Sequence, residues 1–247
     1  MYHNVDSRPS VITFPPDQFQ WQVEWLHSRG YKSIPLSELN RCMTTGQDLP
    51  ERSVVLTFDD GYQSLYTEVF PILQQYGFSA TVFLVAGFCG KDNHWPGQPS
   101  FIPRMKLLTW EQINEMARFG IEFGSHTFHH PRLDHLPASA LYDEIVLPKV
   151  VLESHLGRPV TVFAYPYGRY TDPVKDMVRG TYEAACSTRL GLVKPTSDRY
   201  ALERVEIKYL SHQWIFQRLF HPVFPYYLSA RSAGRVVGSA IFSRAWK

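Results

Sequence analysis

Short apolar runs alternate with segments of helical periodicity along most of the chain. The apolar runs lie at 1–3, 54–58, 80–85, 121–125, 160–165, 182–186 and 203–207, and the helical patterns at 16–29, 62–76, 110–119, 138–157 and 172–179. A short apolar run indicates a buried strand, whereas apolar residues three and four positions apart indicate an amphipathic helix. The alternation predicts an α/β fold with a parallel sheet, a distorted (β/α)7-type barrel.

Prolines mark where several of these helices begin or break. Phe19, Val23 and Leu26 recur at helical spacing, with prolines before them and a glycine after them. Pro71 and Pro148 stand inside helical patterns, where a proline removes a backbone hydrogen bond and kinks or ends the helix. We therefore expect breaks near both positions.

Length and composition fit one catalytic domain with a short extension. The 247 residues are 44% hydrophobic and 15% aromatic, which is enough to bury a sizeable core. We assign residues 1–210 to the catalytic domain and residues 211–247 to a basic, aromatic C-terminal helix or tail.

Two adjacent carboxylates, Asp59 and Asp60, close the apolar run 54–58 and precede Gly61. Successive side chains leave a strand on opposite faces, so the two carboxylates are free to take different roles. One can bind a cation while the other accepts a proton. An ordinary turn is the alternative reading of Asp-Asp-Gly.

Two histidines supply further metal-ligand chemistry. His126 and His130 are four residues apart, a spacing that brings two imidazoles to one side of a helical turn. Together with one Asp they would form an open metal site with room for water. His129 should face away from the shared side, and we rank it well below the other two as a ligand.

Three ordered blocks give the chain a family resemblance. They are Thr57 to Gly61, Ser125 to His130, and Phe163 to Gly168, which reads Phe-Ala-Tyr-Pro-Tyr-Gly. The chain resembles the polysaccharide deacetylases of the NodB-homology type, carbohydrate esterase family 4, and within them the subset similar to poly-N-acetylglucosamine deacetylases. Flanking stretches at 2–5 and 202–205 fit as well, so the resemblance covers most of the chain.

The resemblance implies a role for each motif position. Asp60, His126 and His130 match the positions that hold a divalent metal, most often zinc, with cobalt or nickel as possible substitutes. Asp59 matches the catalytic base, and the backbone N–H of Tyr167 matches a donor to the oxyanion. The proline and glycine beside Tyr167 suit a rigid turn at that point.

The chain departs from the family pattern at two positions. Many relatives have an Arg at the position of Ala164, where it pairs with the catalytic Asp. Arg204 can substitute for it, or it can form a surface ion pair with Glu203 or Glu206. The resemblance also includes a late histidine that acts as general acid.

Two histidines are candidates for that general acid. His3 lies in an opening Tyr-His, as in permuted members of the family, and we prefer it. His212 lies in a late Leu-Ser-His that lacks the preceding apolar strand. A third alternative is that neither histidine serves.

Aromatic side chains near the motifs are candidates for sugar binding. Trp95 lies on an irregular insertion, 86–106, and Tyr62 follows the first block. Aromatic rings cover sugar C–H groups well, although Trp95 can equally pack under its loop. Tyr165 and Pro166 of the third block complete the expected substrate-binding set, and Tyr167 is a further candidate.

Charge and cysteine content exclude several function classes. A formal net charge of +2 is too small to indicate a protein that binds nucleic acid. The three cysteines lack CxxC spacing, which excludes a zinc ribbon or a redox motif. No run of 18 apolar residues and no signal peptide is present. We expect a cytoplasmic or membrane-associated protein if the chain is complete, and leave location open if a leader is missing.

The C-terminal segment 211–247 carries many aromatic residues and no Asp or Glu. Its cations are Arg218, Arg231, Arg235, Arg244 and Lys247. Such a segment can lie against an anionic membrane, or it can be a last helix packed on the barrel with a basic tail. No specific protein partner is implied.

These observations predict metal-dependent hydrolysis of the N-acetyl amide of an N-acetylated sugar, in a glycan or its precursor, with release of acetate. Two alternatives remain. One is an amidase that acts on a small cyclic amide, favoured if the pocket lacks sugar-stacking aromatics. The other is a non-catalytic glycan-binding module, in which Asp59 or His3 would stand out of register with the metal.

Overall fold

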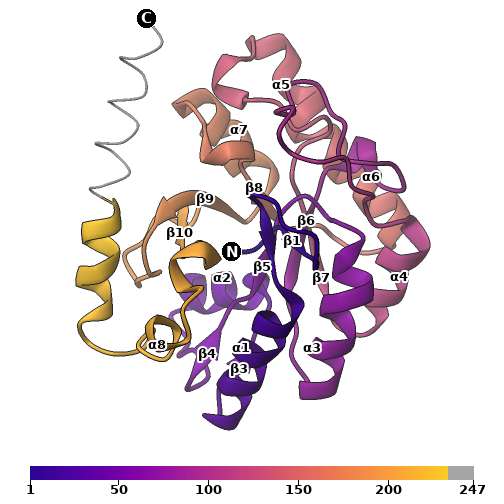
Figure 1. The fold of residues 1–247 in the computed structure, drawn as a ribbon. Helices are drawn as coiled ribbons and strands as arrows, with labels where there is room; N and C mark the ends of the chain where they lie inside the picture. Colours follow the sequence, from indigo (N-terminus) through magenta and orange to yellow (C-terminus); the bar gives the residue numbers. More distant parts are fainter. Residues whose placement is uncertain (233–247) are drawn as a thin grey trace, which may run out of the picture.

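A curled parallel sheet forms the centre of the structure, a computed structural model that describes residues 1–232 (Figure 1). Its six strands are hydrogen-bonded in the order β10-β9-β8-β7-β6-β5, so each strand lies beside its sequence neighbour. The strands are β5 (Thr57–Phe58), β6 (Thr81–Leu84), β7 (Glu122–Ser125), β8 (Val162–Ala164), β9 (Ala184–Leu190) and β10 (Leu202–Arg204). All are parallel, which requires a long crossover between each pair.

The first residues of the chain occupy the seventh strand position. Tyr2 forms a parallel bridge with Phe58, in which the Tyr2 N–H donates to the Thr57 carbonyl at 2.8 Å. On the other side, the Ile207 N–H donates to the Met1 carbonyl at 3.0 Å. These two residues therefore join the β5 edge to the segment after β10. The distorted barrel expected from the sequence is confirmed, with its first strand reduced to a bridge.

Helices cover the outer face of the sheet (Figure 1). They are α1 (Pro16–Ser28), a π-helical turn (Leu65–Val69) that continues into α3 (Phe70–Tyr76), α4 (Trp110–Arg118), α5 (Ala138–Ile145), α6 (Leu147–Leu156) and α7 (Asp172–Thr181). The expected breaks occur, because Pro71 lies in the first turn of α3 and Pro148 in the first turn of α6. A first turn tolerates proline, since its N–H groups have no partner within the helix.

Several short elements were absent from the sequence-based prediction. The main one is α2 (Leu36–Thr45), whose Leu36 and Leu39 pack with inward-facing side chains of the sheet. The others are the pair β1 (Asn4–Val5) with β2 (Thr13–Phe14), strand β3 (Lys32–Ser33), and the 3-10 turns Ala86–Phe88, Leu133–His135, Pro166–Gly168 and Ile207–Leu210. The strand expected at 54–58 is divided into β4 (Ser53–Val54), which pairs with β3, and β5.

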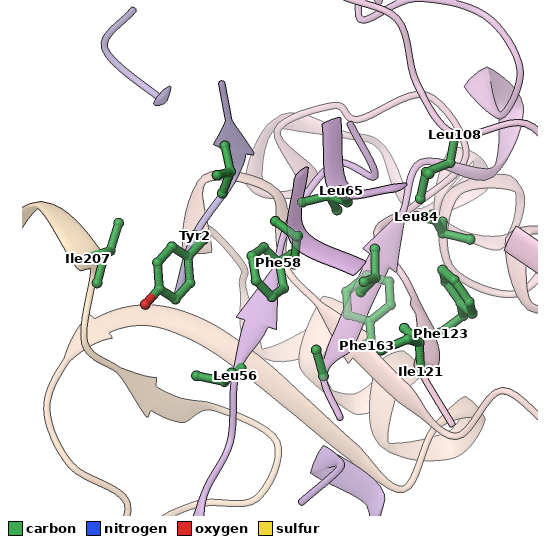
Figure 2. Packing of buried hydrophobic residues seen from close by; sticks show 14 of the residues in the cluster. Tyr2, Leu56, Phe58, Leu65, Leu84, Leu108, Ile121, Phe123, Phe163 and Ile207 are labelled. Carbon is green, nitrogen blue, oxygen red and sulfur yellow. The ribbon is translucent and has the colours of Figure 1, made fainter. Parts of the chain in front are cut away.

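The hydrophobic core fills the space between the sheet and the outer helices. Figure 2 shows Tyr2, Phe58 and Phe163 among its members. Tyr2 stacks on Phe58 with ring centroids 5.0 Å apart, and its hydroxyl donates to Gln22 Oε1 on α1 at 2.6 Å. The bridging position of the first residues is thus held by both packing and a buried hydrogen bond.

The C-terminal segment packs against α1. It contains α8 (Gln213–Phe216) and a helix at 224–232, and Phe216, Phe224 and Leu228 belong to the main core. Trp25 of α1 meets the Phe216 ring edge-on at 5.6 Å. Residues 233–247, with Arg235, Arg244 and Lys247, lie outside the described part. Within residues 1–232, no helix has the length and apolar character needed to cross a membrane.

Candidate metal and catalytic site

The three motif blocks meet at the carboxyl end of the barrel strands. Asp59 and Asp60 follow β5, His126 follows β7, and Pro166 comes shortly after β8. Parallel strands bring their carboxyl ends to one edge, and the loops there carry the active sites of α/β barrels. Residues more than a hundred positions apart in sequence are thereby assembled.

Asp60, His126 and His130 form a compact group of potential metal ligands. One ligand atom from each lies within 4.8 Å of the others, and all three residues are buried. Asp60 Oδ1 is 3.5 Å from His126 Nε2 and 3.3 Å from His130 Nε2. Among the described residues this oxygen has no hydrogen-bond partner. A buried carboxylate oxygen facing two imidazole nitrogens fits a divalent metal, which would satisfy all three.

A main-chain carbonyl orients His126 for this role. His126 Nδ1 is 2.7 Å from the carbonyl oxygen of Ala164 in β8, so Nδ1 carries the proton and Nε2 keeps its lone pair facing Asp60. Burial is the main cause that lowers the pKa of His126 to about 4. The ring is therefore neutral near pH 7, the state in which imidazole binds metal.

The turn from His126 to His130 has an unusual backbone. Thr127 and His130 adopt positive φ angles of 70° and 60°, and Thr127 Oγ1 accepts the His130 N–H at 2.9 Å. His129 points away from the metal group, and its Nδ1 lies 2.6 Å from Glu144 Oε1 on α5. The low rank given to His129 as a ligand agrees with this arrangement, although the metal ligands themselves stay a prediction.

Asp59 lies beside the metal group in a buried ion pair with Arg204. The guanidinium donates to both carboxylate oxygens, at 2.7 and 2.8 Å, and its Nε donates to the Ser187 carbonyl at 3.0 Å. Burial by itself would raise the pKa of Asp59, but the charge of Arg204, with smaller electrostatic effects of His126 and His3, outweighs it and holds that pKa below its ordinary value. Asp59 is therefore ionised at neutral pH.

The alternative of a surface ion pair for Arg204 is wrong. The neighbouring acids have other partners, since Glu203 pairs with Arg189 and Glu206 pairs with Lys208. Arg204 is instead buried, because the β10 strand turns its side chain toward the inside of the barrel. It pairs with Asp59, the partner that the family resemblance assigns to the arginine missing from the third block.

Only one of the two candidate general acids lies near the carboxylates. His3 is half-buried, and it acts electrostatically on both Asp59 and Asp60. His212 is exposed at the start of α8, where it stacks on Trp214 with ring centroids 6.5 Å apart. The assignment of His3 as general acid stays a prediction, and the geometry favours it over His212.

The aromatic candidates differ in their access to solvent. Tyr62 and Tyr165 are fully buried, and Pro166, which follows Tyr165 in the third block, is buried as well. Trp95 is 3% exposed and stacks at a tilt on the His130 ring at 4.6 Å, whereas Tyr167 is 41% exposed and meets the same ring at 4.8 Å. Substrate binding by these residues stays a prediction. Tyr167 is the one with an exposed face.

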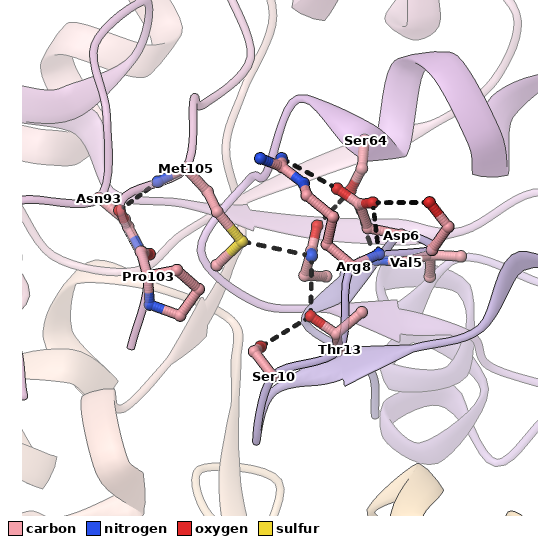
Figure 3. A network of polar contacts seen from close by, with 11 residues as sticks. Val5, Asp6, Arg8, Ser10, Thr13, Ser64, Asn93, Pro103 and Met105 are labelled. Atoms are coloured by element: carbon pink, nitrogen blue, oxygen red, sulfur yellow. Dashed lines mark hydrogen bonds and ion pairs between the residues drawn. The ribbon is translucent and has the colours of Figure 1, made fainter. Parts of the chain in front are cut away.

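A polar network ties the Trp95 loop to the segment that carries His3 (Figure 3). Asn93 Oδ1 accepts the Met105 N–H at 2.8 Å, and Met105 Sδ accepts Asn4 Nδ2 at 3.3 Å. Asn4 also donates to Thr13 Oγ1 at 3.0 Å. Sequence reasoning missed these supporting residues and Glu144. None of them stands in the three motif blocks, and their contacts join segments that are distant in sequence.

Backbone strain is concentrated at the site. Among the described residues, five non-glycine positions have positive φ, and four of them belong to the motif blocks: Asp60, Thr127, His130 and Tyr167. Glycines complete two of these turns. A Cβ on Gly61 would lie 2.6 Å from Leu84 Cδ2, and one on Gly168 would lie 2.1 Å from Thr188 Oγ1. Such strained positions are typical of functional sites, where surrounding contacts enforce them.

Comparisons with known proteins agree with this geometry. The family model for polysaccharide deacetylase matches residues 46–182. YxkH of Bacillus subtilis (strain 168), named as a proposed polysaccharide deacetylase, is 31% identical over 208 residues, which are 84% of this chain and 70% of that protein. The poly-beta-1,6-N-acetyl-D-glucosamine N-deacetylase of Staphylococcus epidermidis is 28% identical over 76% of this chain and 65% of its own length.

The same named enzyme from Escherichia coli (strain K12) is 34% identical, but the match spans 51% of this chain and only 20% of that protein. The chain thus spans less than two thirds of the length of either N-deacetylase.

Solved structures show the same architecture. The Streptococcus pyogenes deacetylase PplD superposes with a TM-score of 0.73 and 26% identity, covering 83% of this chain and 88% of that one. IcaB from Ammonifex degensii superposes with a TM-score of 0.74 and 25% identity, covering 88% and 92%. The matched segment contains all three motif blocks, and the chain belongs to the polysaccharide deacetylase family.

Proposed function

We propose that the protein is a metal-dependent N-deacetylase that removes acetyl groups from an N-acetylglucosamine polymer or its precursor. The observation that carries this proposal is that two buried groups, joined through the adjacent Asp59 and Asp60, lie at one edge of the barrel. One is the set Asp60, His126 and His130, and the other is the ion pair of Asp59 with Arg204. The substrate class is supported by the names of the staphylococcal and Escherichia coli relatives.

Zinc is the metal we propose, with cobalt or nickel as functional substitutes. Two imidazole nitrogens and one carboxylate are a ligand set that zinc uses in catalytic sites, where it keeps a position for water. When bound, such a metal polarises the acetamide carbonyl and lowers the pKa of water at the open position.

The protein residues supply the proton transfers. Asp59 is ionised at neutral pH, and each of its oxygens keeps a lone pair beyond those that face Arg204, so it can accept a proton from the attacking water. His3 would return a proton to the departing amine, which yields acetate and a free amino sugar. The Tyr167 N–H would donate to the oxyanion that forms on the carbonyl oxygen when water adds to the carbonyl carbon.

The other two functions expected from the sequence have less support. A non-catalytic binding module would not need a buried base, an arginine that keeps it ionised and a histidine near both carboxylates. A small cyclic amide would suit a restricted pocket without sugar-stacking aromatics, whereas the exposed ring of Tyr167 offers a stacking face beside His130 of the metal group.

Acetate release from N-acetylglucosamine oligomers by chelator-stripped protein, reloaded with zinc, cobalt or nickel, tests the proposal. We expect release to depend on metal and to fall by about 10²–10⁴-fold in Asp59→Asn, because this change removes the base and leaves the ligands in place. Protein that binds one metal per chain but releases no acetate would indicate that the substrate is another amide. Protein that binds no metal would refute the assignment.

We further propose that the C-terminal segment contacts an anionic membrane surface. Trp214, Phe220, Val223 and Tyr226 are exposed on it, and Arg218 lies over the Trp214 ring in a segment without acidic residues. Aromatic and basic side chains together favour the interface of anionic lipids. Cosedimentation with phosphatidylcholine vesicles, with and without phosphatidylglycerol, tests this. Equal recovery in the supernatant with both would refute it.

A further inference from the structure

Glu144 on α5 is a buried carboxylate that belongs to none of the motif blocks. Only 7% of its surface is exposed, and among the described residues no Lys or Arg pairs with it. Burying a carboxylate without strong partners is unfavourable, so its hydrogen bonds account for its position.

Within residues 1–232, all the side-chain hydrogen bonds of Glu144 go to the turn between the two metal-site histidines. Its Oε2 accepts the backbone N–H of Phe128 at 3.1 Å and that of His129 at 2.9 Å. Its Oε1 lies 2.6 Å from His129 Nδ1, which donates to it. One carboxylate thus receives three donors from two successive residues.

That turn holds an unfavourable backbone. Thr127 and His130, on either side of the two residues that Glu144 contacts, both have positive φ. Left-handed conformations of residues with a Cβ persist only where surrounding contacts enforce them. The conformation matters for the metal group, because it directs the His130 ring so that its Nε2 lies 3.3 Å from Asp60 Oδ1.

We propose that Glu144 is the positioning residue of the metal site, which fixes the turn and thereby aims His130 at the position shared with Asp60 and His126. The inference rests on the metal site of the proposed function. It also gives His129 a role as a donor to Glu144, secondary to the two backbone amides.

Metal affinity and the spectrum of cobalt-loaded protein test this without substrate. The dissociation constant for cobalt, measured by competition with a chromophoric chelator, is compared in wild type, Glu144→Ala, Glu144→Asp and Glu144→Gln. We expect Glu144→Ala and Glu144→Asp to weaken the affinity for cobalt by about 10–100-fold and to change the cobalt absorption bands. Loss of a residue that supports a metal ligand from outside the coordination sphere has effects of this size. Glu144→Gln should keep most of the affinity, because its side-chain carbonyl oxygen can still accept the backbone N–H groups of Phe128 and His129.

Glu153→Ala is the matched control. Glu153 lies on α6, accepts the Val160 N–H at 2.9 Å and pairs with Lys149, but touches no part of the turn. Its loss should lower stability and leave both cobalt readouts unchanged.

The outcomes separate the inference from the proposed function. Wild-type protein that binds no cobalt would refute the metal site itself. Wild-type affinity and spectrum in Glu144→Ala and Glu144→Asp would show that Glu144 only supports helix packing. Glu144→Gln as weak as Glu144→Ala would refute positioning through the backbone amides. If Glu144→Ala does not fold, Glu144→Asp decides the question, since it keeps the charge but withdraws the carboxylate from the turn.

Discussion

At the residue scale, the two adjacent aspartates have different surroundings. Asp59 faces Arg204 from β10, whereas Asp60 faces two histidines that belong to the loop after β7. This follows from the alternation of side chains along a strand and from the positive φ of Asp60, which turns the chain at the strand end. One peptide unit thus separates the proposed base from the proposed ligand.

Arg204→Met should weaken both stability and the proposed chemistry. Removing one partner of a buried ion pair leaves an uncompensated charge, which costs about 3–5 kcal/mol of unfolding free energy. Burial raises the pKa of Asp59 and Arg204 lowers it. Without Arg204 the pKa rises, so the acidic limb of kcat/KM should move to higher pH. Urea unfolding and a pH–rate profile measure the two effects.

Arg189→Met is the control for this change, because it removes the exposed pair with Glu203 on the neighbouring strand. It should change stability by less than about 1 kcal/mol and leave the pH profile in place. An unmoved acidic limb in Arg204→Met would contradict the role of Arg204 in keeping Asp59 ionised.

At the element scale, helices of this fold are held by contacts with distant strands. The clearest case is α2, where Glu122 at the start of β7 accepts the Leu36 N–H at 2.9 Å and the Ser37 N–H at 3.3 Å. Thr81 of β6 contributes a further acceptor to Leu36 at 3.0 Å. The cap of α2 therefore comes from two strands of the sheet, which fixes where this helix begins.

Glu122→Ala should destabilise the protein by about 1–2 kcal/mol, as loss of a helix N-cap does. Metal affinity should stay unchanged, since Glu122 opens β7 and the metal group lies beyond its other end. Urea unfolding and chelator competition measure these quantities. Glu115→Ala, which removes only an exposed bond to Tyr66, is the control. Equal stabilities of the two variants would refute the capping role.

At the scale of the whole molecule, the site joins side chains from several separate strands of the barrel. Asp60 follows β5, both histidines follow β7, and β6 lies between these strands. The pair of Asp59 with Arg204 connects β5 to β10 across the seam that Tyr2 bridges. A metal bound by the three ligands would therefore act as a cross-link at the mouth of the barrel.

Removal of metal should lower the stability of the whole domain. A ligand present at a hundred times its dissociation constant stabilises the native state by about 2.7 kcal/mol. For a protein of this size, we expect the melting temperature to fall by about 5–11 °C on chelation and to recover with added zinc. His126→Ala should show no zinc-dependent shift. The same shift in that variant would place the stabilising metal elsewhere.

Much of the architecture could be predicted from the sequence, because local patterns encode it. Strand and helix periodicity indicated the barrel and its helices, and two internal prolines marked real breaks. The spacing of His126 and His130, with Asp60 added by the family resemblance, identified the group that could hold a metal. Short elements such as α2 were missed, because their stability comes from caps and packing partners supplied by other elements.

The sequence by itself determined the main strands and helices of the barrel, the family and the chemical types at the site, since these depend on residue identity and short-range spacing. Only the tertiary structure decided which partners those residues have. It paired Arg204 with Asp59, placed His3 rather than His212 near the carboxylates, and put Glu144 under the histidine turn. Each of these contacts joins different elements, and only the folding of the sheet into a barrel brings such residues within hydrogen-bond distance.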